Sequence, residues 1–335
     1  MTEITLEDIR LARRRISCHV AHTPLHYSPL CSARLGFDLW LKMENRQHTG
    51  SFKPRGALNK ILSLTPAARA QGIVAASAGN HALGVAHAAR VAGLREVDIY
   101  VQADAAPAKI AKLKQYDIRM HLVGRTFEEA QQAALAHAGS TGATWVSAYD
   151  DVEVIAGQGT CGLEIMEDLP AADTIVVPVG GGGLMAGIAI AAKSIDPGVR
   201  IIGVNPAASP SAWLSKRDGR AYDPYDHEPT LAQGLAGGFG RVPFAVAISM
   251  IDEIVLVSED ELVQAVAALI DSDQVLVEAS GAAAAAAVFA GKIKSGRKCV
   301  AVLSGGNIDA STLSLILNRC RRPEPTTQAV GHPLF

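Results

Sequence analysis

The sequence predicts an α/β fold with two open, mainly parallel sheets that helices cover on both faces. Short runs rich in Val and Ile alternate with Ala-rich segments of helical period along most of the 335 residues. The strand candidates read as continuous apolar runs, such as residues 174–179, which is typical of strands buried on both faces. Local signals mark several helix starts, including the capping box Ser258–Glu261 and Pro107 in a first turn.

Strands and helices are predicted to alternate along the chain. The predicted strands span 38–43, 73–77, 97–101, 118–123, 174–179, 199–204, 252–257 and 297–303. The predicted helices span 80–92, 107–116, 126–138, 184–195, 258–271 and 309–320, with a further packed helix in the alanine run 281–287. Residues 205–250 hold five prolines and many glycines, so we expect a long irregular segment, which in a compact domain is more often functional than disordered.

The composition describes a globular protein without a dedicated nucleic-acid or membrane surface. Hydrophobic residues make up 49% of the chain and charged residues only 19%, which excludes a disordered polyampholyte. Lys and Arg (31) nearly balance Asp and Glu (33), and aromatics reach only 5%, so we expect neither a basic patch nor stacking platforms for bases. Five cysteines without a C-x-x-C pair predict free thiols in a reducing, cytoplasmic compartment rather than a disulfide framework or a zinc site.

One uncharged stretch, residues 174–192, is long enough to resemble a membrane span. Pro178 and the glycines at 180–183 would break a spanning helix near its middle, so we predict a buried strand, a glycine loop and a buried helix instead. The first ten residues carry acids where a signal peptide needs an apolar core, so no export is expected.

The glycine loop Gly180–Gly183, followed by Leu184, is predicted to bind a phosphate group. It connects a strand to a helix, so unhindered backbone N–H groups and the helix dipole would both face an anion. A dinucleotide fingerprint fits poorly, because the next strand ends at Asn205 instead of the acid that would bind a ribose hydroxyl. A P-loop would need Gly-Lys-Ser/Thr, which is missing from this loop.

Two further loops have the same position between a strand and a helix. Ser77–His81 (SAGNH) follows one predicted strand, and Ser304–Asn307 (SGGN) follows another. Loops at the carboxyl ends of parallel strands converge on one crevice, so the three loops together indicate one ligand site. Taken singly, Ser77 and Ser304 are better explained as helix caps.

A lysine segment completes the pattern. Lys53 lies at the start of a predicted helix, with Pro54 in the first turn and glycines nearby that permit close approach. A lone lysine is usually a solvated surface group. Here, however, the helix N-terminus and Arg55 are both expected to favour the neutral amine, the form that attacks a carbonyl. A phosphate cradle and a carbonyl-reactive lysine together indicate pyridoxal 5'-phosphate.

The motifs resemble those of the threonine dehydratase and serine racemase family, a group of fold-type II pyridoxal-phosphate enzymes with a fold like that of the tryptophan synthase β subunit. The resemblance runs from about Leu6 to Asn318. It rests on five segments in order: SFKPRGA at 51–57, SAGNH at 77–81, IAGQGT at 155–160, PVGGGG at 178–183 and SGGN at 304–307.

The resemblance implies a role for each matching position. Lys53 would bind the cofactor covalently and move the Cα proton, while Phe52 would lie against the cofactor ring. Asn80 would bond the phenolic oxygen, Ser304 would face the pyridine nitrogen, and Gly180–Gly183 with Leu184 would hold the phosphate. The substrate would meet Ser77, Asn80, His81 and Gly234, with His81 offering its backbone rather than acting as a base.

Two departures from the racemase branch direct the prediction toward a dehydratase. Ala78 stands where racemases carry a serine that protonates the opposite face of Cα, and alanine has no proton to transfer. Asn205 and Ser211 stand where the metal-binding branch carries carboxylates, so no metal is expected.

The expected activity is β-elimination on a β-hydroxy-α-amino acid, by default L-threonine or L-serine, giving a 2-oxo acid and ammonia. Gln233 replaces an acid that is common in the family dehydratases, which leaves open a bulkier substrate, phenylserine-like or hydroxyectoine-derived. A serine racemase, a β-replacement synthase and a non-catalytic ligand-binding protein are less favoured alternatives. The resemblance also implies a homodimer.

The motifs divide the predicted fold into two domains with the site between them. Residues 1–70 and 151–322 are expected to form a large cofactor-binding domain, and residues 71–150 a smaller α/β domain inserted into it. Residues 323–335 are expected to form an extended tail.

Overall fold

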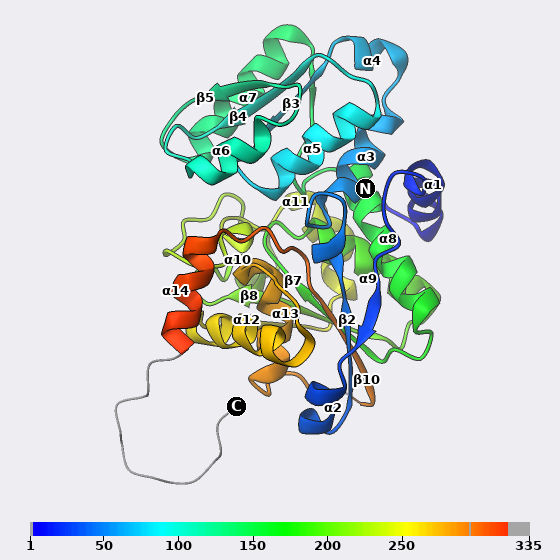
Figure 1. Ribbon diagram of the computed structural model, residues 1–335. Helices are drawn as coiled ribbons and strands as arrows, with labels where there is room; N and C mark the ends of the chain where they lie inside the picture. The colour runs from blue at the N-terminus through cyan, green and yellow to red at the C-terminus, as the bar shows by residue number, and fades with distance from the viewer. Residues whose placement is uncertain (1–2, 295, 321–335) are drawn as a thin grey trace.

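The computed structural model describes residues 3–294 and 296–320, which form two sheets covered by helices (Figure 1). The larger sheet has six strands in the order β1-β2-β10-β7-β8-β9, and the smaller has four in the order β5-β4-β3-β6. The strand bounds are β1 Leu25–Tyr27, β2 Asp38–Lys42, β3 Ile73–Ala76, β4 Val97–Val101, β5 Arg119–Leu122, β6 Thr144–Trp145, β7 Thr174–Pro178, β8 Arg200–Pro206, β9 Glu253–Val257 and β10 Lys298–Val302.

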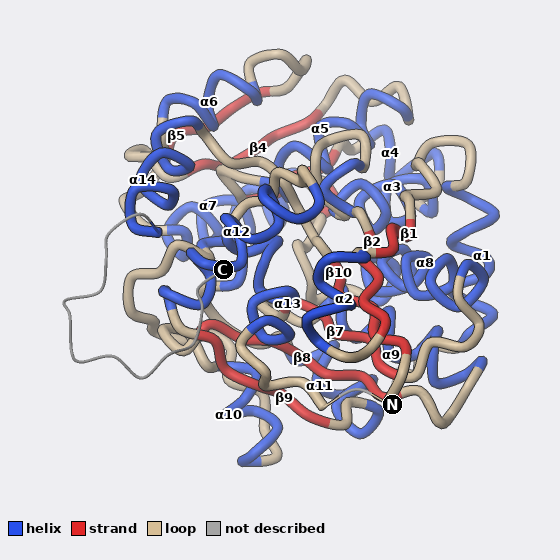
Figure 2. The backbone as a smooth tube through the Cα atoms, turned by 60° about the horizontal axis from the view of Figure 1, so that its bottom comes forward, coloured by secondary structure: helices blue, strands red, loops and turns tan. Residues whose placement is uncertain are grey.

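Helices connect most of the strands and lie on both sides of the sheets (Figure 2). Their bounds are α1 Leu6–Ile16, α2 Pro29–Leu35, α3 Lys53–Ser63, α4 Pro66–Ala70, α5 Asn80–Val91, α6 Pro107–Leu113, α7 Phe127–Thr141, α8 Val152–Asp168, α9 Gly183–Ile195, α10 Ser211–Asp218, α11 Arg241–Ala247, α12 Glu259–Asp273, α13 Ala279–Phe289 and α14 Ala310–Cys320. Short 3-10 turns lie at Glu44–Arg46, Gln233–Leu235 and Ile248–Met250.

The predicted fold class is confirmed, because every strand pair but one is parallel among the described residues. The exception is β1, which pairs antiparallel with β2 at the edge of the larger sheet. Successive residues of a strand face opposite sides, so β7 contributes Val176 to a core with α12 and α13, and Ile175 and Val177 to a core with α8 and α9. Burial on both faces explains why the strands read as continuous apolar runs.

The smaller sheet is built in the same way from strands that all lie between Ile73 and Trp145. One face packs on α3 and α5, and the other on α7. The predicted domain boundaries at residues 70/71 and 150/151 stay predictions, and the expected tail at 323–335 lies outside the described residues.

The structure differs from the sequence-based expectations in residues 205–250 and in α8. The first segment contains the helices α10 and α11, so its irregular part is shorter than expected. Helix α8 was not predicted, since three glycines lower its intrinsic propensity. It forms because those glycines permit close packing on α9: a Cβ on Gly162 would lie 2.9 Å from Ile188 Cα, and one on Gly159 would lie 3.0 Å from the Gly187 carbonyl oxygen.

The uncharged stretch 174–192 divides as predicted into β7, the glycine loop and most of α9. Within residues 3–294 and 296–320, no helix combines the length and apolar character that crossing a bilayer requires.

Candidate active site

Lys53 opens α3, and its amine is held by the loop that follows the smaller sheet. The Nζ atom donates to the carbonyl oxygen of Ala148 at 2.9 Å and lies 5.0 Å from the centroid of the Phe52 ring. Burial lowers the pKa of the Lys53 amine to about 8, against a smaller opposing effect of the Glu278 carboxylate. An amine with this pKa is partly neutral near physiological pH, which suits it to attack a carbonyl carbon.

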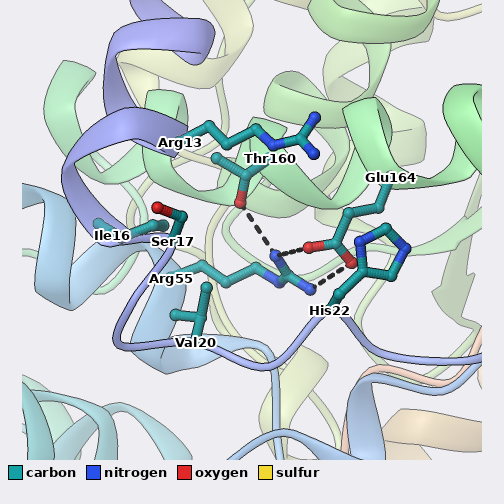
Figure 3. Close-up of a pocket in the computed structure, with 8 residues that line it drawn as sticks. All are labelled: Arg13, Ile16, Ser17, Val20, His22, Arg55, Thr160 and Glu164. Carbon is teal, nitrogen blue, oxygen red and sulfur yellow. Dashed lines mark hydrogen bonds and ion pairs between the residues drawn. The ribbon is translucent and has the colours of Figure 1, made fainter.

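Arg55 does not contribute to this shift, so that part of the sequence-based expectation is wrong. Its guanidinium is fully buried and donates to Glu44 at 2.8 Å. It also donates to Glu164 at 2.7–2.8 Å and to Thr160 at 3.1 Å (Figure 3). Lys42, also fully buried, donates to the same Glu164 at 2.7 Å. The two cations and two carboxylates neutralise one another, so Arg55 anchors the start of α3 instead of tuning Lys53.

A cavity of about 160 Å³ borders this ionic network (Figure 3). The residues around it are Arg13, Ile16, Ser17, Val20, His22, Arg55, Thr160 and Glu164. None of the site residues predicted from the sequence is among them. The Arg55 guanidinium, moreover, already donates all five of its N–H groups to protein acceptors.

The glycine loop opens α9 and can only be built from glycine at several positions. Gly182 has a φ of +90°, and a Cβ there would lie 2.3 Å from Phe239 Cε2. A Cβ on Gly181 would lie 2.1 Å from Tyr149 Cγ, and one on Gly180 would lie 2.9 Å from Leu235 Cα. The N–H groups of the first helical turn have no acceptor within the helix, so the loop retains donors for an anion.

The loop and the lysine amine together fit a cofactor that carries a phosphate and an aldehyde. Leu184, which follows the loop in the first turn of α9, is buried. The Ser304 loop lies beside the Lys53 segment: Phe52 donates its N–H to the Ser304 carbonyl at 3.1 Å, and Gly306 donates to the Gly50 carbonyl at 2.8 Å. Pyridoxal phosphate supplies the two reactive groups that these residues suit.

Asn80 is held in one orientation by two side chains that the sequence did not single out for this role. Its Nδ2 donates to Glu278 Oε1 at 2.5 Å, and its Oδ1 accepts from Asn307 Nδ2 at 2.8 Å. The second Nδ2 hydrogen therefore remains available to a ligand oxygen. Burial raises the pKa of the Glu278 carboxyl. No pattern in the sequence indicates Glu278, because only the fold brings the start of α13 to the start of α5.

Ser77 and His81 lie on either side of the Gly79 turn. Ser77 does not cap α5, as the helix-cap interpretation expected, because the N-cap residue is Gly79, whose N–H donates to Ser77 Oγ at 3.0 Å. His81 Nε2 donates to the Val146 carbonyl at 2.9 Å. Burial, with the nearby Lys53 amine, lowers the pKa of His81 to about 3, so the ring stays neutral and is unsuited to acid–base work near pH 7.

Gly234 and Asn205 are each held by hydrogen bonds to neighbouring segments. Gly234 donates its N–H to Ser280 Oγ at 2.9 Å, and its carbonyl oxygen lies 3.0 Å from where a Cβ of Gly180 would be. Asn205 caps α10: its Oδ1 accepts the N–H groups of Ala212 and Trp213, and its Nδ2 donates to the Val179 carbonyl. The Asn205 amide is thus occupied in holding the backbone.

Comparison with protein-family models assigns the chain to a family. The family model described as "Pyridoxal-phosphate dependent enzyme" matches residues 16–305. The chain belongs to this family. The cofactor of this pyridoxal-phosphate dependent enzyme is therefore pyridoxal phosphate, as the glycine loop and Lys53 predicted.

Several relatives of the chain are named as enzymes that degrade L-threonine. The chain is 45% identical to the L-threonine ammonia-lyase of Thermotoga maritima, across 94% of this chain and 79% of that protein. It is 40% identical to the catabolic L-threonine dehydratase of Escherichia coli, across 93% and 96%. The predicted resemblance to this group of pyridoxal-phosphate enzymes is confirmed.

Solved structures with the same fold include both branches of the group. Maize serine racemase superposes with a TM-score of 0.88 and 32% identity, covering 95% of this chain and 98% of that one. The processed form of threonine deaminase isoform 2 from Solanum lycopersicum gives a TM-score of 0.86 and 34% identity, covering 95% and 90%. The predicted fold-type II architecture is thereby confirmed.

The pKa of Lys53 leads to a prediction for cofactor loading. Only the neutral amine attacks the aldehyde, so the rate at which cofactor-free protein binds pyridoxal phosphate covalently should rise with pH with a midpoint at about pH 8. Stopped-flow absorbance between pH 6 and 10 measures this rate. A midpoint close to 10.5, the ordinary lysine value, would contradict the effect of burial.

Proposed function

We propose that the protein is an ammonia-lyase that converts L-threonine or L-serine to a 2-oxo acid and ammonia. The observation that carries the proposal is the position of the Lys53 amine. It is partly neutral, is held by the Ala148 carbonyl at 2.9 Å, and stands at the start of a helix beside the Ser304 loop. The names of the relatives support the choice of β-hydroxy amino acids.

Bound pyridoxal phosphate supplies an electron sink conjugated to Cα of the substrate. Lys53 removes the Cα proton, and the electron pair of that C–H bond forms the Cα–Cβ double bond while the Cβ–O bond breaks. The hydroxyl accepts a proton, in net the one that Lys53 removed from Cα, and leaves as water. The unsaturated amino acid that is released then hydrolyses to the 2-oxo acid and ammonia, so that atoms and charge balance.

The remaining site residues are proposed to bind and orient. The free Nδ2 hydrogen of Asn80 would donate to the phenolic oxygen of the cofactor, since Glu278 and Asn307 fix the amide. Phe52 would pack on the ring, Ser304 would contact the pyridine nitrogen, and Gly180–Gly183 with Leu184 would hold the phosphate. The backbone at Ser77, Asn80 and His81, with Gly234, would receive the substrate carboxylate.

A substrate panel tests the proposal. Ammonia release is measured on holoenzyme with L-threonine, L-serine, a phenylserine and D-serine, and D-serine formed from L-serine is measured by chiral chromatography. We expect turnover of threonine and serine and no racemisation, because Ala78 has no proton to transfer to the opposite face of Cα. Threonine ranking far below phenylserine would overturn the substrate assignment, and D-serine formation would overturn the dehydratase assignment.

We also propose a homodimer located in the cytoplasm. All five cysteines lie within the described residues and none forms a disulfide, which suits a reducing compartment. The dimer rests on the family resemblance. Light scattering coupled to size-exclusion chromatography measures the mass in solution, and a monomeric mass would contradict the proposed dimer.

A further inference from the structure

The loop that holds the Lys53 amine also contacts the glycine loop. Residues 147–150 connect β6 to α8, and Ser147 Oγ accepts the N–H groups of Tyr149 and Asp150 at 3.4 and 2.9 Å. The Ala148 carbonyl accepts from Lys53, so Tyr149 is one residue away from the atom that holds the amine. This loop is therefore placed to affect both the lysine and whatever the glycine loop binds.

The Tyr149 ring occupies the space that side chains at two glycines would fill. A Cβ on Gly181 would lie 2.1–2.6 Å from three atoms of this ring, and a Cβ on Gly240 would lie 2.8 Å from its Cδ2. Gly240 also donates its N–H to the Gly181 carbonyl at 3.1 Å. Only glycine fits at positions 181 and 240, because the Tyr149 ring lies between the glycine loop and the segment that ends at Gly240.

The hydroxyl of Tyr149 is anchored at the far end of the ring. It donates to Asp223, at 3.3 Å to Oδ1 and 3.5 Å to Oδ2. Burial, together with the nearby Asp150 carboxylate, raises the pKa of Asp223. Asp223 itself is packed on Gly238, where a Cβ would lie 2.1 Å from Oδ1. The irregular part of residues 205–250 therefore wraps around this tyrosine.

We propose that Tyr149, anchored by Asp223, is a positioning residue. It fixes the position of the glycine loop relative to the Ala148 carbonyl, which is the hydrogen-bond partner of Lys53. The ring supports the glycine loop, while the Tyr149 backbone carries Ala148 and hence the acceptor of the amine. A small displacement of either would misalign the amine with a phosphate-anchored cofactor, and misplacement of about 1 Å costs on the order of 10²-fold in rate. The part of this proposal that concerns turnover rests on the proposed lyase function.

Two near-isosteric variants test the proposed positioning role of Tyr149 and Asp223. Tyr149→Phe removes only the hydroxyl and Asp223→Asn only the charge, so both should fold. For each we expect about three- to tenfold weaker binding of pyridoxal phosphate to the cofactor-free protein, with kcat for threonine falling more than KM changes. The double variant should be no worse than Tyr149→Phe alone, because Asp223 is proposed to act only through the Tyr149 hydroxyl. Tyr149→Ala should weaken cofactor binding further.

Tyr222→Phe is the matched control, since it removes a hydroxyl that donates to Asp218 in the same segment without contacting the glycine loop. We expect wild-type cofactor binding and kcat from it. Wild-type values in both Tyr149→Phe and Asp223→Asn, or fully additive losses in the double variant, would overturn the proposal. If wild-type protein binds the cofactor but does not turn over threonine, the proposed function fails, while the binding titrations still decide the role of Tyr149.

Discussion

Replacing Lys53 by alanine should abolish turnover and the visible absorbance of covalently bound cofactor. The amine is the nucleophile that attaches the cofactor and the base that moves the Cα proton, so both functions are lost together. We expect a fall in kcat of roughly 10³-fold or more, because general base catalysis alone contributes 10²–10⁴-fold. Steady-state ammonia release and an absorbance spectrum of the purified variant measure the two effects.

Lys53→Arg serves as the companion variant. It keeps a positive charge and much of the length, but a guanidinium that stays protonated cannot attack an aldehyde. It should therefore be as inactive as Lys53→Ala while filling the site better. Either variant retaining full activity would remove Lys53 from the mechanism.

Replacing Glu164 by glutamine should destabilise the protein by about 3–5 kcal/mol, because it leaves a buried cation without its counter-charge. Arg55 and Lys42 are both fully buried and both bond this carboxylate at 2.7–2.8 Å. After the change Arg55 keeps only Glu44 as a paired carboxylate, and Lys42 keeps only Asp168, at 3.8 Å. Urea unfolding of cofactor-free protein followed by circular dichroism gives the free energy of unfolding.

The pH dependence separates charge loss from a simple packing defect. Burial alone would raise the pKa of Glu164, but Arg55 and Lys42 outweigh it and the pKa is lowered from 4.5. A carboxyl with a depressed folded-state pKa stabilises fully above its unfolded pKa, and this contribution is lost as pH falls through the folded value. The difference between wild type and Glu164→Gln should therefore shrink below about pH 4.5.

Glu167→Gln is the matched control on the same helix. Its partner Arg13 is 39% exposed and Glu167 itself 47%, so loss of this ion pair should change stability by only about 0–1 kcal/mol. Equal destabilisation by the two Glu→Gln changes would contradict the special role of the buried network.

Patterns in the sequence were sufficient to predict local structure wherever residues adjacent in the chain determine it. The capping box at Ser258 is present, with the Ser258 side chain bonded to the Glu261 N–H, and Pro107 lies in the first turn of α6. The glycine loop and Lys53 could be interpreted together because the strand-to-helix order that surrounds them is local. Helix α8 was not predicted, because it is stabilised by contact with α9 and not by its own composition.

The sequence by itself determined the fold class, the cofactor and the residue expected to react with it, since periodicity, glycine loops and the lysine motif are encoded in short segments. Only the tertiary structure decided that Arg55 belongs to an ion network with Glu44 and Glu164 rather than to Lys53. It alone also brought Glu278 to Asn80, and Tyr149 to Gly181 and Asp223. The reason is that side-chain direction and the meeting of distant segments depend on packing, which no local pattern records.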